Sequence, residues 1–245
     1  MPLVTRAAVG SELKLPPPYE SLRLREFGDA FAHAIAVAPE RGAGTLVHVG
    51  RFDLAEFAVV LEPKDPLAQA RRALYAGMAA LADAIAAAAP PETAIHIDWP
   101  DALYVNWGLV GGGRLAWPAK TAANKVPDWL VFGGMIRTAS KTVDPGLTPN
   151  LTALDEEGFA EITSNHVIES FARNLMLLLN DWQESGFAGV SKAYCERLSR
   201  ENGQNWEIDD NGDLISFNAG RQAESKALLP RLARPAWLNV LGRHA

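Results

Sequence analysis

The sequence contains few of the residues that build disulfide frameworks and metal centres. Its 245 residues include one cysteine, Cys195, which excludes an internal disulfide bond and a zinc site made of several cysteines. No two of its five histidines lie four residues apart, so a metal-binding spacing is absent. A Gly-x-Ser-x-Gly segment, which presents the catalytic serine of many hydrolases, is also absent. We therefore expect no metal, and a single cysteine is typical of proteins from a reducing cytoplasm.

The sequence also lacks a block of basic residues. Its net charge is -6, which argues against a nucleic-acid partner held by phosphate contacts. The most apolar stretch, residues 79–89, contains Asp83 and is too short to span a bilayer. Residues 1–10 have no apolar run after their arginine, so a signal peptide is not indicated. These features predict a soluble cytoplasmic protein without nucleic-acid or membrane partners, and they leave open whether it forms a homodimer.

The apolar residues, 48% of the chain, are enough for a substantial core, and their spacing predicts several strands and helices. We expect strands at residues 45–49, 57–61, 93–98, 103–105, 109–110 and 129–138. The short turn at residues 106–108 predicts that the strands on either side of it form a hairpin. We expect helices at residues 66–89, 165–182 and 191–200, and one at residues 30–38 that Asp29 caps and Pro39 ends, after an irregular leader of residues 1–26. Strands interrupted by long helices predict an α/β protein of the α+β type, in which helices pack on a mixed β-sheet.

The C-terminal part of the chain has a different pattern. Residues 206–208 and 214–217 are short apolar runs on either side of a polar turn, which predicts a small β-hairpin. We place a boundary near Glu201. The chain is then divided into an α/β domain of residues 1–200 and a small C-terminal β appendage of residues 201–245.

Glycines interrupt two of the expected strands. One strand contains Gly111, Gly112 and Gly113, followed by Arg114, and the other contains residues 133–134, both glycine. Glycine weakens a strand unless another group approaches its backbone closely. The glycines therefore indicate either the floor of a groove for a flat or chain-like ligand, or two β-bulges. If the strand is regular, Gly112 and Arg114 face the same side, where the guanidinium could meet a carboxylate or phosphate.

Several segments in the same order resemble a known family. Residues 99–101, Trp-Pro-Asp, followed by residues 103–106 and then Val-Gly-Gly at residues 110–112, resemble the Lys-Trp-Pro-Asn-Asp and Lys-Leu-Ala-Gly region of biotin protein ligases. Residues 131–135 resemble the later Gly-x-Gly strand of that family, and residues 171–198 its last helical pair. The resemblance, to the biotin/lipoate protein ligases, covers residues 25–200 and implies the fold of their catalytic domain.

This resemblance implies a chemistry and a set of ligand-binding residues. The ligases activate a carboxylic acid with ATP, hold the acyl-adenylate and pass the acyl group to a lysine of a carrier domain. The positions that match the family's binding segments are Arg51, Asp98, Trp99, Asp101, Gly111, Gly112, Arg114, Gly133 and Gly134. No catalytic residue is identified.

The sequence departs from the ligases where they carry positive charge. Their Gly-Arg-Gly-Arg loop corresponds here to residues 50–53, which contain a single arginine, Arg51. Asp98 and Leu109 stand where the ligases have lysines, and Ile136 stands where they have an asparagine. Two like charges about 4 Å apart repel by roughly 4 kcal/mol at an effective dielectric of about 20, so an ionised Asp98 would oppose an adenylate.

Three functions are consistent with the sequence. The first is a non-catalytic relative that binds a small carboxylic acid or acyl group, a nucleotide, or a biotinyl or lipoyl carrier domain. The second is an active acyl-protein ligase or transferase for biotin, lipoate or octanoate, and only this activity implies ATP and Mg²⁺. The third is a structural or interaction protein whose groove is filled by its own side chains.

Overall fold

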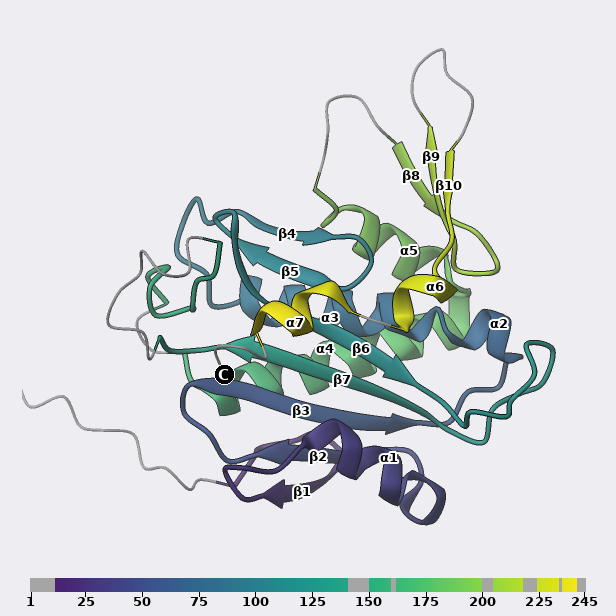
Figure 1. The fold of residues 1–245 in the computed structure, drawn as a ribbon, viewed down its shortest axis with the longest axis horizontal. Helices are drawn as coiled ribbons and strands as arrows, with labels where there is room; N and C mark the ends of the chain where they lie inside the picture. The colour runs from purple at the N-terminus through teal and green to yellow at the C-terminus, as the bar shows by residue number, and fades with distance from the viewer. Residues whose placement is uncertain are drawn as a thin grey trace, which may run out of the picture.

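A seven-stranded mixed sheet forms the centre of the protein (Figure 1). The computed structural model describes residues 12–140, 150–159, 162–199, 205–217, 224–233 and 235–241. The strands are β1 (Glu20–Leu24), β2 (Thr45–Val49), β3 (Leu54–Leu61), β4 (Ile95–Asp98), β5 (Ala102–Val105), β6 (Gly108–Ala116) and β7 (Leu130–Arg137). Their order is β1-β2-β3-β7-β6-β5-β4, and all neighbours are antiparallel except β1 and β2. The predicted mixed sheet with helices is therefore confirmed.

Helices cover both faces of this sheet. They are α1 (Ala30–Arg41), α2 (Leu67–Ala70), α3 (Ala73–Ala86), α4 (Ser164–Ser185) and α5 (Ala188–Cys195). We call the face packed by α3 and α4 the core face, because its side chains, such as Phe57 and Phe132, belong to the main hydrophobic core. The opposite face, called the outer face, carries Ala58 and Val131 and is covered at the β1–β3 end by α1. Strand β3 is apolar almost throughout because it is buried on both faces.

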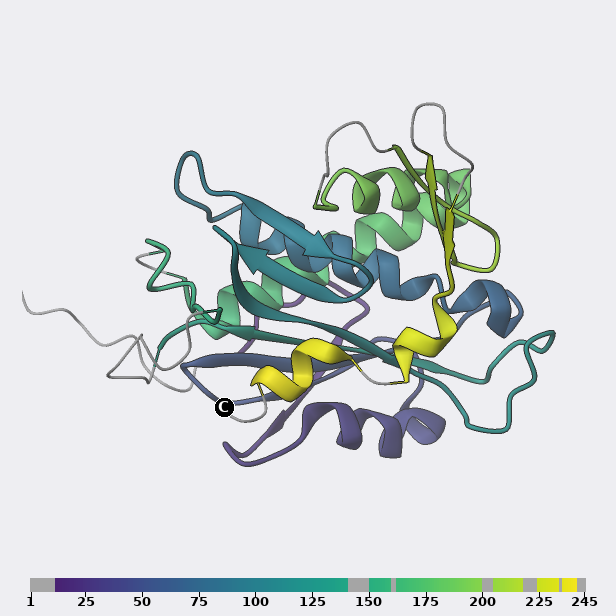
Figure 2. The same cartoon turned by 45° about the horizontal axis from the view of Figure 1, so that its top comes forward.

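The C-terminal part adds a second sheet and two short helices. Strands β8 (Asn205–Ile208), β9 (Leu214–Phe217) and β10 (Glu224–Lys226) form an antiparallel sheet in the order β10-β9-β8. Helix α6 (Leu229–Leu232) follows, and α7 (Ala236–Leu241) returns to the outer face of the main sheet, where it contacts β6. Figure 2 shows α7 and α1 on the same side of the sheet, opposite α3 and α4. The expected hairpin is confirmed, whereas β10, α6 and α7 were not predicted.

The structure corrects three expectations about single elements. The leader contains the edge strand β1, whose mixed polar sequence pairs with β2 in parallel. Helix α1 is capped by Asp29, which accepts a hydrogen bond from the Ala32 amide at 2.9 Å, but it continues past Pro39 to Arg41. Pro39 removes one backbone donor within the last turn, and the helix ends two residues later. The expected helix at 66–89 is divided into α2 and α3 around residues 71–72.

Strands β5 and β6 form the hairpin on which the family resemblance depends. Asn106 and Trp107 connect them with φ values of 45° and 72°, the left-handed conformation that two-residue hairpin turns require. Strands β4, β5 and β6 are neighbours in the sheet, as the resemblance requires.

Candidate functional site

The register of the sheet aligns one residue from each of five neighbouring strands on the outer face. Asp98 pairs with Ala102, Ala102 with Gly112, Gly112 with Met135, and Met135 with Glu56. Directly paired residues point to the same side of a sheet, so these five form a line across the outer face, which we call the outer-face row. Neighbouring strands lie about 4.8 Å apart, so the two carboxylate-bearing ends of the row are about 19 Å apart. A glycine lies at its centre.

The four glycines named from the sequence do not share one surface. Gly112 and Gly133 lie on the outer face, whereas Gly111 and Gly134 lie on the core face. The prediction that they line one surface is therefore wrong, since successive residues of a strand alternate between faces. Strand β7 pairs regularly with both β6 and β3 through residues 133 and 134, so its glycines form no bulge. Strand β6 has an irregular register against β5, between Leu103 and Tyr104, next to Gly111. The alternative of two β-bulges is therefore wrong for β7 and is supported only next to Gly111.

The space above each outer-face glycine is filled by a ring from the covering helix. A Cβ atom on Gly112 would lie 2.6 Å from the Trp237 indole of α7, and closer still to the Asp101 carbonyl oxygen. A Cβ atom on Gly133 would lie 2.5 Å from the Phe31 ring of α1. The two glycines are thus needed for close packing of these rings.

Helix α7 is attached to the sheet mainly by Trp237. Its side chain is 2% exposed, and its Nε1 donates a hydrogen bond to the Gly113 carbonyl oxygen at 3.2 Å. Together with Leu241 it packs on Ala102 and Leu109, in a small apolar cluster separate from the main core. The side chain at the position of the ligases' second lysine, Leu109, is therefore buried beneath α7.

Arg114 lies on the outer face with Gly112, as predicted. Its guanidinium lies 4.1 Å from the centre of the Phe31 ring, and one of its nitrogens is 3.4 Å from the Asp29 carboxylate. Burial lowers the pKa of Arg114, and the nearby Asp29 and Glu56 carboxylates oppose that effect. Burial also raises the pKa of Glu56, which accepts a hydrogen bond from the Ala30 amide. The charge of Arg114 is therefore largely compensated within the protein.

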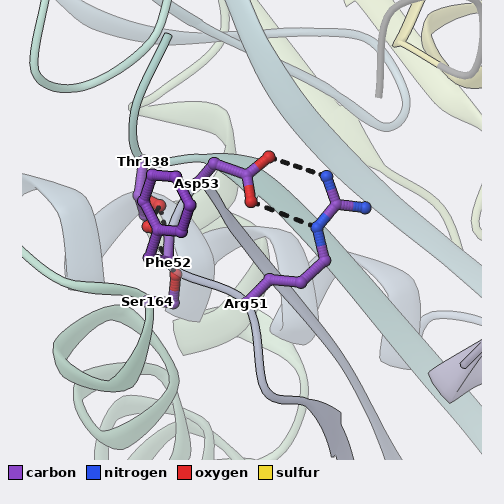
Figure 3. A network of polar contacts seen from close by, with 5 residues as sticks. All are labelled: Arg51, Phe52, Asp53, Thr138 and Ser164. Atoms are coloured by element: carbon purple, nitrogen blue, oxygen red, sulfur yellow. Dashed lines mark hydrogen bonds and ion pairs between the residues drawn. The ribbon is translucent and has the colours of Figure 1, made fainter. Parts of the chain in front are cut away.

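Arg51 is also paired within the protein. Its Nη2 and Nε donate to the two oxygens of Asp53 at 2.7 and 3.2 Å, so that both groups face each other in a two-point contact (Figure 3). The Thr138 hydroxyl donates to the Phe52 carbonyl oxygen at 2.7 Å, and the Ser164 hydroxyl donates to the same oxygen at 3.3 Å. This short connection is thus held against the end of β7 and the start of α4.

Asp101 is a buried acid with an unused hydrogen-bonding atom. It is 4% exposed, and its Oδ2 has no hydrogen-bond partner among the residues that the structure describes. Burial is the largest cause that raises the pKa of Asp101 to about 7, and the nearby Asp98 carboxylate is the second. Arg231 opposes this increase. Its backbone carbonyl accepts a hydrogen bond from the Gly113 amide at 2.9 Å, which fixes it beside β6.

Trp99 is held away from the centre of the outer-face row. Its Nε1 donates to the Tyr75 hydroxyl at 3.2 Å, and the next residue, Pro100, accepts a hydrogen bond from Tyr194 at 2.8 Å. Trp99 instead lines a cavity of about 270 Å³ between the edge of β4 and the C-terminal sheet, and Asp98, at the end of the outer-face row, lines the same cavity. The structure therefore distributes the nine predicted residues over five places: the outer face, the core face, the connection at 50–53, this cavity, and the β4–β5 turn that contains Asp101.

Comparison with known proteins decides the family. A model described as the biotin/lipoate A/B protein ligase family matches residues 15–196. The chain belongs to this family. The search of curated protein sequences returned no match.

Solved structures of ligase-like proteins have the same fold. A biotin protein ligase-like protein of unknown function from Silicibacter sp. TM1040 is 27% identical, has a TM-score of 0.78, and covers 91% of this chain and 100% of its own. The biotin protein ligase of Aquifex aeolicus, in complex with biotin and ATP, is 12% identical with a TM-score of 0.66 over 85% of this chain and 95% of its own. The Leishmania major enzyme with biotinyl-5-AMP is 12% identical with a TM-score of 0.55 over 87% of this chain and 100% of its own.

Sequence reasoning about this ligase-family chain missed the features that its C-terminal part contributes. Trp237 on the sheet, Arg231 beside Asp101 and Trp99, and the cavity wall made by β8–β10 all depend on contacts between distant segments. A second, larger hollow of about 910 Å³ lies between α4, α5 and β8 and contains none of the nine predicted residues.

Within the described ranges, no group of three or more acidic, histidine or cysteine side chains is arranged to hold a metal ion. No helix in the same ranges is long and apolar enough to cross a membrane.

Proposed function

We propose that this member of the biotin/lipoate ligase family binds a small carboxylic acid or acyl group on the outer face of its sheet and does not adenylate it. The observation that carries the proposal is the two-point contact between Arg51 and Asp53. This contact pairs Arg51, the only arginine in the segment that corresponds to the basic loop of the ligases, with a carboxylate of the protein itself.

Adenylation needs more positive charge than the outer face offers. An enzyme that transfers a nucleotidyl group must stabilise the triphosphate and the leaving pyrophosphate with cations and oriented donors. Here Arg114 is close to Asp29 and Glu56, and the outer-face row ends in carboxylates, Asp98 and Glu56. These charges oppose a polyanion, whereas a small ligand with one carboxylate is disfavoured much less.

A ligand on the outer face has to compete with Trp237. The indole fills the space above Gly112, so the acid or acyl group would bind after α7 moves aside. Relatives of the same fold crystallised with biotin, ATP or biotinyl-5-AMP support the chemical class of the ligand. A biotinyl or lipoyl carrier domain would be the corresponding protein partner.

A structural or interaction role is the second candidate, and the same residue favours it. If Trp237 never leaves Gly112, the outer face is a permanently packed surface rather than a binding site. The two candidates differ in what removal of the indole does to ligand binding.

The test combines an activity assay with a binding assay on the full chain. We expect no ATP–pyrophosphate exchange above background with biotin, lipoate or octanoate. In a thermal-shift panel of the same acids, Trp237→Ala should bind at least one of them more tightly than the unmodified chain. A ligand at about 100 times its dissociation constant stabilises the folded state by about 2.7 kcal/mol. The matched control is Trp107→Ala, because Trp107 is 73% exposed in the β5–β6 turn.

Two results would contradict the proposal. Robust exchange by the unmodified chain would show that it is an active ligase despite the Arg51–Asp53 contact. Absence of binding by both the unmodified chain and Trp237→Ala would favour the structural role.

A further inference from the structure

The cavity beside β4 is formed by three parts of the chain that are distant in sequence. Residues 197–199 run parallel to the edge of β4, where the Ile97 amide donates to the Arg197 carbonyl at 2.7 Å and the Ser199 amide donates to the Ile97 carbonyl at 3.0 Å. The C-terminal sheet forms the facing wall. We call this space the edge cavity; it is lined by Ile97, Asp98, Trp99, Leu198, Ser199, Trp206, Leu214, Ser216, Glu224 and Lys226.

The charges of the edge cavity disfavour a simple anion. Two carboxylates, Asp98 and Glu224, line it together with one ammonium group, Lys226. The buried Asp101 lies close enough to Asp98 for the two to interact electrostatically. A ligand with a single negative charge would meet a net negative lining, whereas a ligand with both charges can place each beside its opposite.

The aromatic lining attracts cations. The ammonium of Lys226 lies 5.9 Å from the Trp206 ring, and the guanidinium of Arg231 lies 6.0 Å from the Trp99 ring. These separations are at the outer limit of about 6 Å for cation–π attraction. The protein's own cations lie near both rings, so the two tryptophans form the part of the lining that favours a positive charge.

Trp206, which lines both this cavity and the larger hollow between α4, α5 and β8, carries an unused donor. The Trp206 indole N–H is buried and has no hydrogen-bond partner in the part of the chain that the structure describes. A buried donor without a partner is unfavourable, so an acceptor atom of a ligand would be stabilised there. Ser199 and Ser216 lie in the same lining, where the Ser216 hydroxyl donates to the Glu224 carbonyl oxygen at 3.4 Å.

We propose that the edge cavity binds a small zwitterion that carries one ammonium and one carboxylate group, as a free amino acid does. The ammonium lies between Asp98 and Glu224 against the tryptophan rings, and the carboxylate lies at Lys226 and the Trp206 indole N–H. The volume of about 270 Å³ equals that of about nine liquid water molecules at roughly 30 Å³ each, which suits an amino acid. This proposal goes beyond the acyl-binding function and does not depend on it, because neither Gly112 nor Trp237 lines the cavity.

The test is a thermal-shift screen of the free L-amino acids on the full chain, followed by calorimetric titration of the best binder. The same titration is made with its two half-molecules, the alkylamine that lacks the carboxylate and the acid that lacks the amine. We expect an amino acid to bind with a dissociation constant of about 1 mM or tighter, and both half-molecules to bind at least about tenfold more weakly.

Variants assign the binding to the edge cavity. Asp98→Asn and Lys226→Met each remove one charge from an exposed side chain, and each should weaken binding at least about tenfold. Trp206→Phe keeps an aromatic ring, removes the N–H donor and should weaken binding as well. The matched controls Glu40→Gln and Lys64→Met remove the same charges from exposed residues outside the cavity and should leave binding unchanged.

Three outcomes would overturn the proposal. They are no binding by any amino acid, equal binding by either half-molecule, and binding that Asp98→Asn and Lys226→Met leave unchanged. Failure of the acyl-binding proposal has a separate signature, because it is read from Trp237→Ala with carboxylic acids that lack an amine.

Discussion

Removal of the Trp237 indole tests whether α7 is a separately held cover on the sheet. Trp237 is 2% exposed and donates one hydrogen bond, to the Gly113 carbonyl oxygen. A buried aromatic side chain removes about 150–250 Å² from water, which at about 25 cal/mol per Å² corresponds to about 4–6 kcal/mol. This is an upper bound, since the alanine keeps part of the contact, and Trp→Ala changes in cores cost about 3–5 kcal/mol.

We expect this loss to appear locally rather than in the stability of the whole fold. The cluster that holds α7 is separate from the main core between the sheet and α3 and α4. When the docking energy of α7 is lost, the helix can detach while the main core stays folded. Trp237→Ala should therefore abolish hydrogen-exchange protection of the amides in α7 and change the free energy of global unfolding by less than about 1 kcal/mol.

The assay is hydrogen exchange of α7 together with urea denaturation of the full chain. In the control Trp107→Ala, both quantities should stay within about 0.5 kcal/mol of those of the unmodified chain, as for most exposed substitutions. A global loss of about 3–5 kcal/mol in a single transition would refute the reasoning, because α7 would then be part of the main cooperative unit. Unchanged exchange in α7 would refute it differently, since Trp237 would not be what holds the helix.

Three further predictions concern the charged residues. Burial raises the pKa of Asp101 from 3.8 to about 7, so the folded state favours the neutral carboxyl group. The stability associated with this neutral group is fully present below about pH 4 and is lost as the pH rises through about 7. Asp101→Asn should match the unmodified chain at low pH and exceed its stability at pH 8 by up to about 4 kcal/mol in chemical denaturation, whereas equal pH profiles would contradict the assigned burial. Asp53→Asn should release Arg51 and strengthen binding of a non-hydrolysable acyl-adenylate by up to about tenfold at low salt, and an unchanged affinity would mean that the Arg51 charge does not reach the ligand. Asp98→Lys should strengthen binding of the same analogue, because it replaces a repelling carboxylate at the end of the outer-face row, and no gain in calorimetric titration would place Asp98 outside its reach.

Much of the main sheet could be predicted because its signals are local. A continuous apolar run predicted β3, largely apolar segments predicted β2 and β7, and the Asn106-Trp107 turn between short strands predicted the β5–β6 hairpin. Alternation along a strand also placed Gly112 and Arg114 on one side, which the pairing of β6 with β7 bears out. The edge strand β1 was missed because it has polar residues at most positions, so no apolar pattern marks it.

The shape of the candidate site could not be predicted, because it depends on register and on distant contacts. Whether Gly134 shares a face with Gly112 is decided by which residue of β6 lies opposite it, and no local pattern specifies that pairing. Helix α7 has six residues, too few for a clear helical period, and the importance of Trp237 follows from where it docks. The same is true of the pair Arg51 and Asp53, whose contact depends on the shape of the connection around Phe52.

The hydrogen bond from Trp237 to the Gly113 carbonyl joins residues 124 positions apart, which has a consequence for the order of folding during synthesis. At about 5–20 residues per second, the ribosome needs about 6–25 s to make the intervening chain. Strands β2 to β7 have all emerged by then, and domains fold as they become available, so the apolar surface of Ala102 and Leu109 waits uncovered for α7. We therefore expect nascent chains arrested before residue 235 to bind a hydrophobic probe at this surface, and chains released after residue 241 to lose that binding.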